Sequence, residues 1–272
     1  SVIRKVKPSI VFHLAAQSSV LVGYKNPKDT VETNVIGTVN MLEAIRSCNT
    51  VKSAVIVTTD KVYLNLEKKI KFKETAALGG HDIYSSSKAV CEILTASYIK
   101  SFYLKLNNCK IATARSGNCI GGGDWTKDRI IKDCVESFLF NKNLIIRSPK
   151  ASRPWQHVME PLFGYLKLAR KLYFDNNKKF VGSWNFGPNI NNNLKVIDVA
   201  KLGKKILNSK SKILKTCITV HIDARNVLIM FISVYFKFPG RKLDRIFKIQ
   251  QLKKLLLTNL IQIQAQSFFC LT

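Results

Sequence analysis

Negative charge is scarce in this sequence of 272 residues, which has 17 acidic side chains against 44 basic ones and a formal net charge of +27. Long hydrophobic runs are also missing. The longest one, residues 227–236, is half as long as the stretch of about 20 residues that a membrane helix needs. A basic start followed by an apolar stretch and a cleavage site is not visible either. We therefore expect no membrane association and a cytoplasmic location.

Metal-ligand spacings are lacking as well. The seven cysteines form no CxxC pair, and the four histidines lie far apart in the sequence. An odd number of scattered cysteines without a framework is typical of reduced thiols in the cytosol. We expect no metal site.

The excess of lysine does not follow the pattern of a nucleic-acid-binding surface. Basic residues are spread along every segment, runs such as 68–71 are short, and no basic patch is interleaved with aromatic residues. We interpret the lysines as solvated surface residues and expect no nucleic-acid partner. The alternative is a non-catalytic basic protein, whose binding to nucleic acid or to an acidic surface would weaken steeply with salt.

Short apolar runs alternate with helical patterns along most of the chain. We expect buried strands within 9–17 and at 54–57, 110–114 and 183–186, and helices at 28–47, 83–103, 129–140 and 159–173. Strands that alternate with helices predict a parallel, doubly wound α/β sheet. Ligands of such a sheet bind outside the carboxyl ends of its strands, where the polar clusters of this sequence fall.

One pair of residues carries the chemistry. Tyr84 and Lys88 are separated by one helical turn and lie on the same helix face. A nearby ammonium favours the phenolate, which makes Tyr84 a candidate general base. Because Y-x-x-x-K alone is a weak signal, we also rely on its position after a strand that ends in Thr-Thr-Asp-Lys, residues 58–61.

Several motifs together resemble the extended short-chain dehydrogenase/reductase family. They are His-Leu-Ala-Ala-Gln at 13–17, Asn34 within 33–38, Thr-Thr-Asp-Lys-Val-Tyr at 58–63, and the Tyr84/Lys88 pair. The segments 78–88, 115–125 and 153–161 narrow the resemblance to the CDP-glucose 4,6-dehydratases, over about residues 8–208. The resemblance implies an NAD-dependent hydro-lyase that makes a 4-keto-6-deoxy sugar, as in deoxysugar and O-antigen-type biosynthesis. An epimerase or another dehydratase of the same family is the alternative.

The resemblance also implies roles for individual residues. Tyr84, assisted by Thr59 and Lys88, would deprotonate the sugar 4-hydroxyl, and Asp60 would protonate the departing 6-hydroxyl. Lys61 stands where dTDP-glucose dehydratases have a glutamate base, so it is a candidate C5 base, with a salt bridge to Asp60 as the alternative. NAD would contact Leu14, Ala15, Ala16, Asn34, Thr58, Tyr84 and Lys88. The nucleotide sugar, CDP-glucose, would contact Gln17, Asn118, Arg153, Trp155 and His157.

Some of these residues have simpler interpretations. Small residues at 14–16 can ease packing, the amides of Gln17 and Asn118 can cap loops, and Trp155 can belong to a core. Arg153 suits a diphosphate because a guanidinium binds phosphate oxygens in a bidentate manner.

The family comparison implies a domain organisation. We expect a partial Rossmann-like NAD-binding lobe at 1–125, to which 183–187 return, a smaller C-terminal substrate-binding lobe mainly at 126–208, and an unplaced tail at 209–272 that fits a shifted reading frame. Because no G-x-G-x-x-G phosphate loop is present, we expect the first strand–helix–strand portion to be missing and the chain to bind NAD weakly. Family members are commonly homodimers, which pair through the helix at 83–103.

Overall fold

The computed structural model describes residues 2–65, 72–106, 109–126, 128–188 and 193–215. These residues form two compact units. The first contains the described parts of 1–117 and 160–189, and the second contains those of 118–159 and 190–228.

The centre of the first unit is a parallel sheet. Its strands are β1 (Ile10–His13), β2 (Ser53–Val57), β3 (Lys110–Ser116) and β8 (Gly182–Phe186), hydrogen-bonded in the order β1-β2-β3-β8. All three pairings are parallel, so the carboxyl ends of these strands share one edge. The predicted parallel α/β sheet is therefore confirmed.

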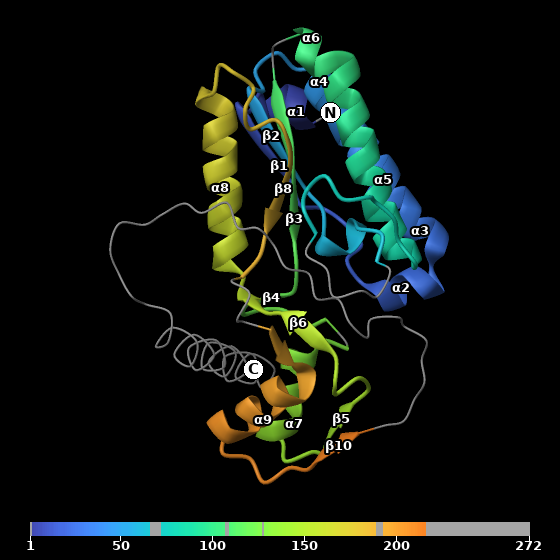
Figure 1. Cartoon of the computed structure of the whole chain (residues 1–272), viewed down its shortest axis with the longest axis vertical. Coiled ribbons are helices and arrows are strands. Elements are labelled where there is room, and N and C mark those ends of the chain that lie inside the picture. Colours follow the sequence, from blue (N-terminus) through green and yellow to red (C-terminus); the bar gives the residue numbers. More distant parts are fainter. Residues whose placement is uncertain (1, 66–71, 107–108, 127, 189–192, 216–272) are drawn as a thin grey trace, which may run out of the picture. The chain divides into compact units, whose positions relative to one another are not determined.

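Helices cover both faces of this sheet (Figure 1). Helix α8 (Met159–Phe174) lies on one side, and α5 (Ile83–Tyr98) and α3 (Pro27–Val31) lie on the other. The remaining helical segments of this unit are α1 (Val2–Val6), α2 (Val20–Lys25), the π-helix η1 (Glu32–Ile36), α4 (Gly37–Arg46), the 3-10 turn η2 (Asp60–Val62), the π-helix η3 (Ile99–Tyr103) and α6 (Leu104–Leu106). The predicted helix at 28–47 thus exists as α3 and α4 joined through η1, and the predicted helix at 83–103 exists as α5 continued by η3.

Alternation along the strands divides the core between the two faces. In β2, Ala54 and Ile56 pack in one cluster with Leu42 and Ile45 of α4, whereas Val55 packs with α8 in another. Leu42 and Ile45 are almost completely buried, and burial of such a side chain stabilises the fold by about 1.5–3 kcal/mol. This two-sided burial explains why the strands read as short, continuous apolar runs.

The second unit is smaller and contains both helices and short strands. Strand β4 (Cys119–Ile120) pairs with β7 (Gln156–His157), β5 (Leu144–Ile146) with β10 (Ile213–Lys215), and β6 (Ser152–Pro154) antiparallel to β9 (Asn193–Lys195). Helices α7 (Ile130–Leu139) and α9 (Val196–Ile206) pack together over Cys134, Phe138 and Ala200. The helix predicted at 129–140 corresponds to α7.

The division differs from the predicted boundaries in three places. The second unit begins after Gly117 and not after residue 125, because the pairing of β4 with β7 keeps 118–125 there. Helix α8 belongs to the first unit, because its apolar face packs on β3 and β8. Residues 209–215 of the predicted tail belong to the second unit through β10, and 216–272 lie outside the described residues.

Candidate active site

The segment after β1 combines an exposed apolar surface with an internally bonded loop. Leu14 is 48% exposed, and Ala15 is exposed as well. By contrast, the side-chain amide of Gln17 donates to Ser19 O (3.0 Å) and to Thr30 Oγ1 (2.9 Å). Gln17 therefore holds this loop, and its predicted contact with the sugar stays a prediction. Leu14 and Ala15 leave the strand end accessible.

Asn34 connects this loop to α5. It is buried in the π-helix η1, accepts from the backbone N–H of Gln17 (2.8 Å), and donates through Nδ2 to Gln17 O (3.1 Å) and Ser87 Oγ (2.9 Å). Single-turn π segments occur frequently at functional sites. The predicted cofactor residue Asn34 thus fixes the backbone around the end of β1.

The segment after β2 holds the buried candidate residues Thr58, Thr59 and Asp60. Thr59 caps the turn η2: its hydroxyl accepts from the backbone N–H of Lys61 (3.4 Å) and donates to Asp60 Oδ1 (3.0 Å). Capping by the threonine explains why the chain turns immediately after the strand. The turn places the predicted catalytic residues Thr59, Asp60 and Lys61 in succession at the carboxyl end of β2.

Helix α5 begins at the same place. Asp82 caps it by accepting from the backbone N–H of Ser85 (3.0 Å), and α5 packs against η2. Tyr84 and Lys88 are 8% and 6% exposed, and Lys88 Nζ donates to Val57 O at 3.1 Å. Tyr84 and Lys88 therefore lie at the carboxyl end of β2, beside the segment 59–61.

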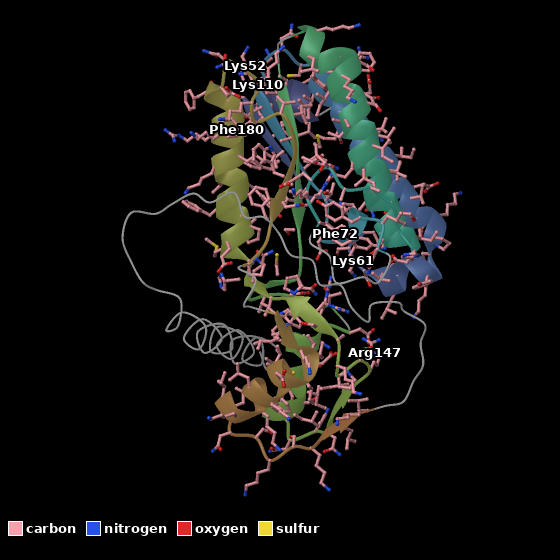
Figure 2. All side chains as sticks on the ribbon, viewed as in Figure 1. Lys52, Lys61, Phe72, Lys110, Arg147 and Phe180 are labelled. Atoms are coloured by element: carbon pink, nitrogen blue, oxygen red, sulfur yellow. The ribbon has the colours of Figure 1, made fainter. Side chains whose placement is uncertain are left out.

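Two lysines, Lys61 and Lys88, bring positive charge to this site. Lys61 Nζ lies 5.9 Å from the centroid of the Tyr84 ring. Figure 2 shows Lys61 near the carboxyl edge of the sheet and Lys52 and Lys110 near its opposite end. Burial lowers the pKa of the Lys88 ammonium, and the neighbouring Cys91 and Glu92 oppose the shift. Burial and then the charge of Lys88 lower the pKa of His13, which favours a neutral ring.

The other predicted substrate residues belong to the second unit. Asn118 O accepts from the backbone N–H of Gln156 (3.2 Å), and Trp155 Nε1 donates to Leu194 O (2.9 Å). Arg153 Nη1 donates to Ser152 O (2.9 Å), and His157 Nδ1 accepts from the Met159 N–H (3.2 Å). All four side chains are half-buried, and their contacts with the nucleotide sugar stay predictions.

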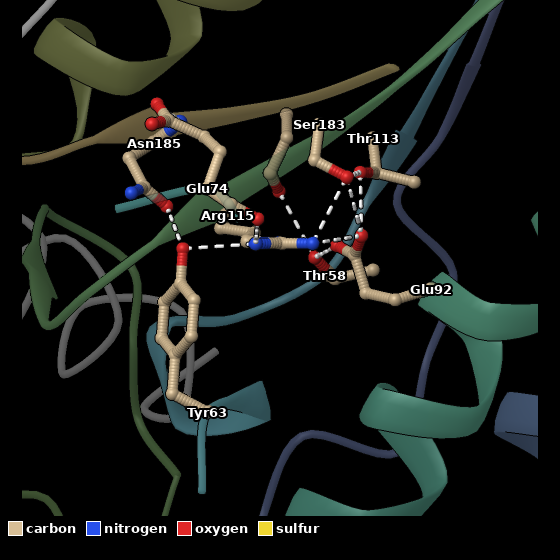
Figure 3. Close-up of polar contacts among 9 residues, drawn as sticks. Thr58, Tyr63, Glu74, Glu92, Thr113, Arg115, Ser183 and Asn185 are labelled. Atoms are coloured by element: carbon tan, nitrogen blue, oxygen red, sulfur yellow. Dashed lines mark hydrogen bonds and ion pairs between the residues drawn. The ribbon is translucent and has the colours of Figure 1, made fainter. Parts of the chain in front are cut away.

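Sequence reasoning missed a buried polar network beside this site. Glu92 of α5 pairs with Arg115 of β3 at 2.8 Å, and both side chains are at most 3% exposed. Figure 3 shows Thr58, Tyr63, Thr113, Ser183 and Asn185 arranged around this pair. A glutamate one turn after Lys88 and an arginine inside an apolar strand were the signals that could have indicated it.

In the part of the chain that the structure describes, no three or more His, Cys, Asp or Glu residues are grouped so as to hold a metal ion. Within the same ranges, no helix has both the length and the apolar character needed to cross a membrane.

The fold and this edge define a Rossmann-like α/β protein with the tyrosine–lysine pair of short-chain dehydrogenases/reductases. A model of the GDP-mannose 4,6 dehydratase family matches residues 1–234. The chain belongs to this family. The resemblance that we noted in the sequence is thereby confirmed.

Relatives with curated functions narrow the comparison. The chain is 45% identical over 190 residues to the CDP-glucose 4,6-dehydratase of Salmonella typhimurium, an alignment that covers 68% of this chain and 53% of the relative. It is 27% identical over 214 residues to the UDP-glucose 4-epimerase of Mycoplasma genitalium, with coverages of 74% and 62%. The chain thus spans about half the length of the Salmonella relative.

Solved structures support the fold. The UDP-glucose 4-epimerase of Thermotoga maritima with UDP-glucose matches with a TM-score of 0.76 at 17% identity, over 96% of this chain and 80% of that one. The UDP-glucuronic acid 4-epimerase of Bacillus cereus, in complex with UDP-glucuronic acid and NAD, matches with a TM-score of 0.72 at 17% identity, over 97% and 77%. At these identities the likeness shows the fold alone.

Proposed function

We propose that the chain carries the reaction centre of a nucleotide-sugar 4,6-dehydratase that converts CDP-glucose to CDP-4-keto-6-deoxyglucose with NAD. The observation that carries this proposal is the position of Tyr84 and Lys88 on α5, beside Thr59, Asp60 and Lys61 at the carboxyl end of β2. The 45% identity to the Salmonella CDP-glucose 4,6-dehydratase supports the choice of substrate.

The residues present fit a nicotinamide cofactor on one observation. The carboxyl end of β1 exposes Leu14 and Ala15, whose short or apolar side chains allow a ligand to approach the backbone closely. Leu14, Ala15, Ala16 and Lys88 would hold the cofactor, and the NAD bound in the Bacillus cereus relative supports NAD as that cofactor. When bound, the nicotinamide supplies acceptance of a hydride from sugar C4 and its return to C6.

Each proton transfer then has a candidate residue. Tyr84 Oη takes the proton of the 4-hydroxyl, since the Lys88 ammonium favours the phenolate. The Thr59 hydroxyl, which donates to Asp60 Oδ1 in the structure, turns to donate a hydrogen bond to the same oxygen when substrate binds. Oxidation at C4 makes the C5 proton acidic, and Asp60 protonates the departing 6-hydroxyl. Asp60 favours dehydration over epimerisation, because an epimerase has no leaving hydroxyl to protonate.

Lys61 is the candidate C5 base. Its Nζ lies 5.9 Å from the Tyr84 ring centroid, so the amine belongs to the same edge of the site. A lysine acts as a base only when its surroundings favour the neutral amine. Bound substrate that excludes water from this edge would supply that condition.

The test is turnover of CDP-glucose in the presence of NAD, followed by the alkaline absorbance of the 4-keto-6-deoxy sugar. Because the chain covers about half of its Salmonella relative, a chimaera carrying the rest of that relative is assayed beside it. Tyr84→Phe should lower kcat by about 10²–10⁴-fold, the usual contribution of a general base. Tyr98→Phe, the same change at the other end of α5, is the matched control and should leave kcat unchanged.

The outcomes separate the alternatives. Product from the chimaera that Tyr84→Phe abolishes and Tyr98→Phe preserves supports the proposal. A chimaera that folds and converts UDP-glucose to its 4-epimer, but leaves CDP-glucose intact, would identify an epimerase instead. A folded chimaera that acts on neither sugar would refute the assignment of this edge as a reaction centre.

Two further properties belong to the same proposal. We place the enzyme in the cytoplasm, and the cysteines among the described residues are free thiols, as expected there.

We also propose a homodimer through α5. Its support is the apolar surface of Val90 and Ile93, which are 38% and 52% exposed on this helix. Light scattering on the purified protein, with Ile93→Glu as the disrupting variant, tests the dimer.

A further inference from the structure

One buried carboxylate collects hydrogen bonds from several segments of the first unit. Glu92 accepts from the hydroxyl of Thr58, from Thr113 Oγ1 (2.7 Å), from Ser183 Oγ (3.0 Å) and from Arg115 Nη2 (2.8 Å). These donors come from β3, from β8 and from the residue that follows β2, while Glu92 itself belongs to α5. A single side chain therefore ties the helix to the three neighbouring strand segments (Figure 3).

Its partner extends the network in the opposite direction. Arg115 Nη1 donates to Tyr63 Oη (2.9 Å) and to Glu74 O (3.0 Å), and the Tyr63 hydroxyl donates to Asn185 Oδ1 (2.5 Å). Burial acts to lower the pKa of Arg115, but the hydrogen bond and the charge of Glu92 outweigh it and the pKa is raised. The guanidinium thus stays charged inside the protein.

Two residues of the network flank the candidate catalytic segment in the sequence. Thr58 immediately precedes Thr59, Asp60 and Lys61, and Tyr63 follows them after one residue. The hydroxyls of Thr58 and Tyr63 connect to the two members of the same ion pair. Glu92 also lies one helical turn after Lys88 on α5.

We propose that the Glu92–Arg115 pair is a positioning device, which fixes the segment 59–62 through Thr58 and Tyr63 and fixes it relative to the Tyr84–Lys88 face of α5. This inference rests on the proposed function and adds residues to it. Thr58, Tyr63, Glu92 and Arg115 act through their neighbours and not on the substrate. The role of Thr58 then differs from the cofactor contact that the family resemblance implied, because its hydroxyl is directed to Glu92.

A purely structural ion pair is the competing interpretation, because buried pairs occur in cores without any part in function. The two interpretations differ in which hydroxyls matter. Thr58 and Thr113 both donate one hydroxyl to the carboxylate of Glu92, and both are buried. Thr58 adjoins the catalytic segment, whereas Thr113 lies within β3. Thr58→Val and Thr113→Val are therefore matched variants.

Hydrogen exchange of the purified chain tests the anchoring without any need for turnover. The Leu64 N–H bonds to Ala77 O (2.9 Å) and the Gly79 N–H bonds to Val62 O (2.8 Å), so these two amides report on the end of the segment. Thr58→Val and Tyr63→Phe should each speed their exchange by about tenfold relative to amides of β2, as expected for local opening. Thr113→Val should change the exchange rates of the Leu64 and Gly79 amides by the same factor as those of the β2 amides.

Turnover and cofactor affinity test the consequence for the reaction, in whichever of the chain and the chimaera is active. Misplacement of reacting groups by about 1 Å can lower the rate up to roughly 10²-fold. We expect kcat to fall about tenfold or more in Thr58→Val and in Tyr63→Phe, with the Kd for NAD unchanged, and to fall less than about twofold in Thr113→Val.

The outcomes of the two arms are distinct. Selective exchange together with a selective loss of kcat supports the positioning role. Equal responses of Thr58→Val and Thr113→Val in either arm would overturn it in favour of a structural pair, and a weaker Kd for NAD in Thr58→Val would restore the cofactor contact. If neither protein turns over CDP-glucose, the proposed function fails, and hydrogen exchange alone decides whether the pair anchors the segment.

Discussion

Replacement of Glu92 by Gln keeps the shape of the side chain but removes the charge that faces Arg115. The side chains of Glu92 and Arg115 are 1% and 3% exposed, so the guanidinium would remain buried without a counter-charge. An amide also offers one acceptor oxygen to the four groups that now donate to the carboxylate. We therefore expect the free energy of unfolding to fall by about 3–5 kcal/mol, the usual result of removing one member of a buried ion pair.

Urea unfolding followed by circular dichroism measures this loss, and thermal unfolding supplies a second reading. A change of 1 kcal/mol shifts Tm by roughly 2–4 °C in a protein of this size, so Tm should fall by about 6–20 °C. A double variant, Glu92→Met with Arg115→Met, removes both charges and should recover most of the loss, because neither charge is then left buried alone.

A second pair provides the control for burial. Arg46 and Glu43 are 2.6 Å apart, even closer than Arg115 and Glu92, but their side chains are 41% and 40% exposed. Glu43→Gln should leave the urea midpoint almost unchanged, because solvent screens an exposed pair. If Glu92→Gln lowers the midpoint no more than Glu43→Gln does, the reasoning from burial is refuted.

Two other predictions concern helix packing and pH. Gly164→Ala in α8 should destabilise the protein by about 1–3 kcal/mol, because the new Cβ would lie 2.4 Å from the Phe186 ring. Gly203→Ala in α9 meets its nearest neighbour at 3.5 Å and should stabilise the protein by up to about 1 kcal/mol. Urea midpoints of the two variants that move in the same direction would contradict this reasoning. Burial lowers the pKa of His13 below 6.5, so the unfolded chain binds the extra proton first and stability should be lost as pH falls through 6.5. His13→Asn should flatten that part of the stability profile, and an unchanged slope would exclude His13 as the group responsible.

The parallel sheet and its helices could be predicted because the central strands β2 and β3 are buried on both faces. Val55 packs on α8 while Ala54 and Ile56 pack on the other face, which leaves the continuous apolar run that the sequence displays. Tyr84 and Lys88 could also be placed together, since helical spacing alone puts them on one face.

The rest depends on contacts that periodicity does not encode. The strands of the second unit have two or three residues each, too few to show an alternating pattern. The hydrogen bonds of Gln17 to Ser19 and Thr30 depend on how the loop folds back on itself, which residue spacing does not show. The positioning role proposed for Glu92 rests on its donors on β3 and β8, which lie 21 to 91 positions away in the sequence.

The position of β8 in the chain has a consequence for the order in which the first unit is built during synthesis. Residues 118–159, which belong to the second unit, are translated between β3 and the α8–β8 segment. A ribosome must therefore release the second unit's first half before the strand that carries Ser183 and Asn185 emerges. Until then Arg115 lacks its contact with Ser183 and Tyr63 lacks its acceptor on Asn185. Closure of the buried network thus requires docking of β8, so the candidate active site completes these contacts only after residues 118–159 have left the exit tunnel.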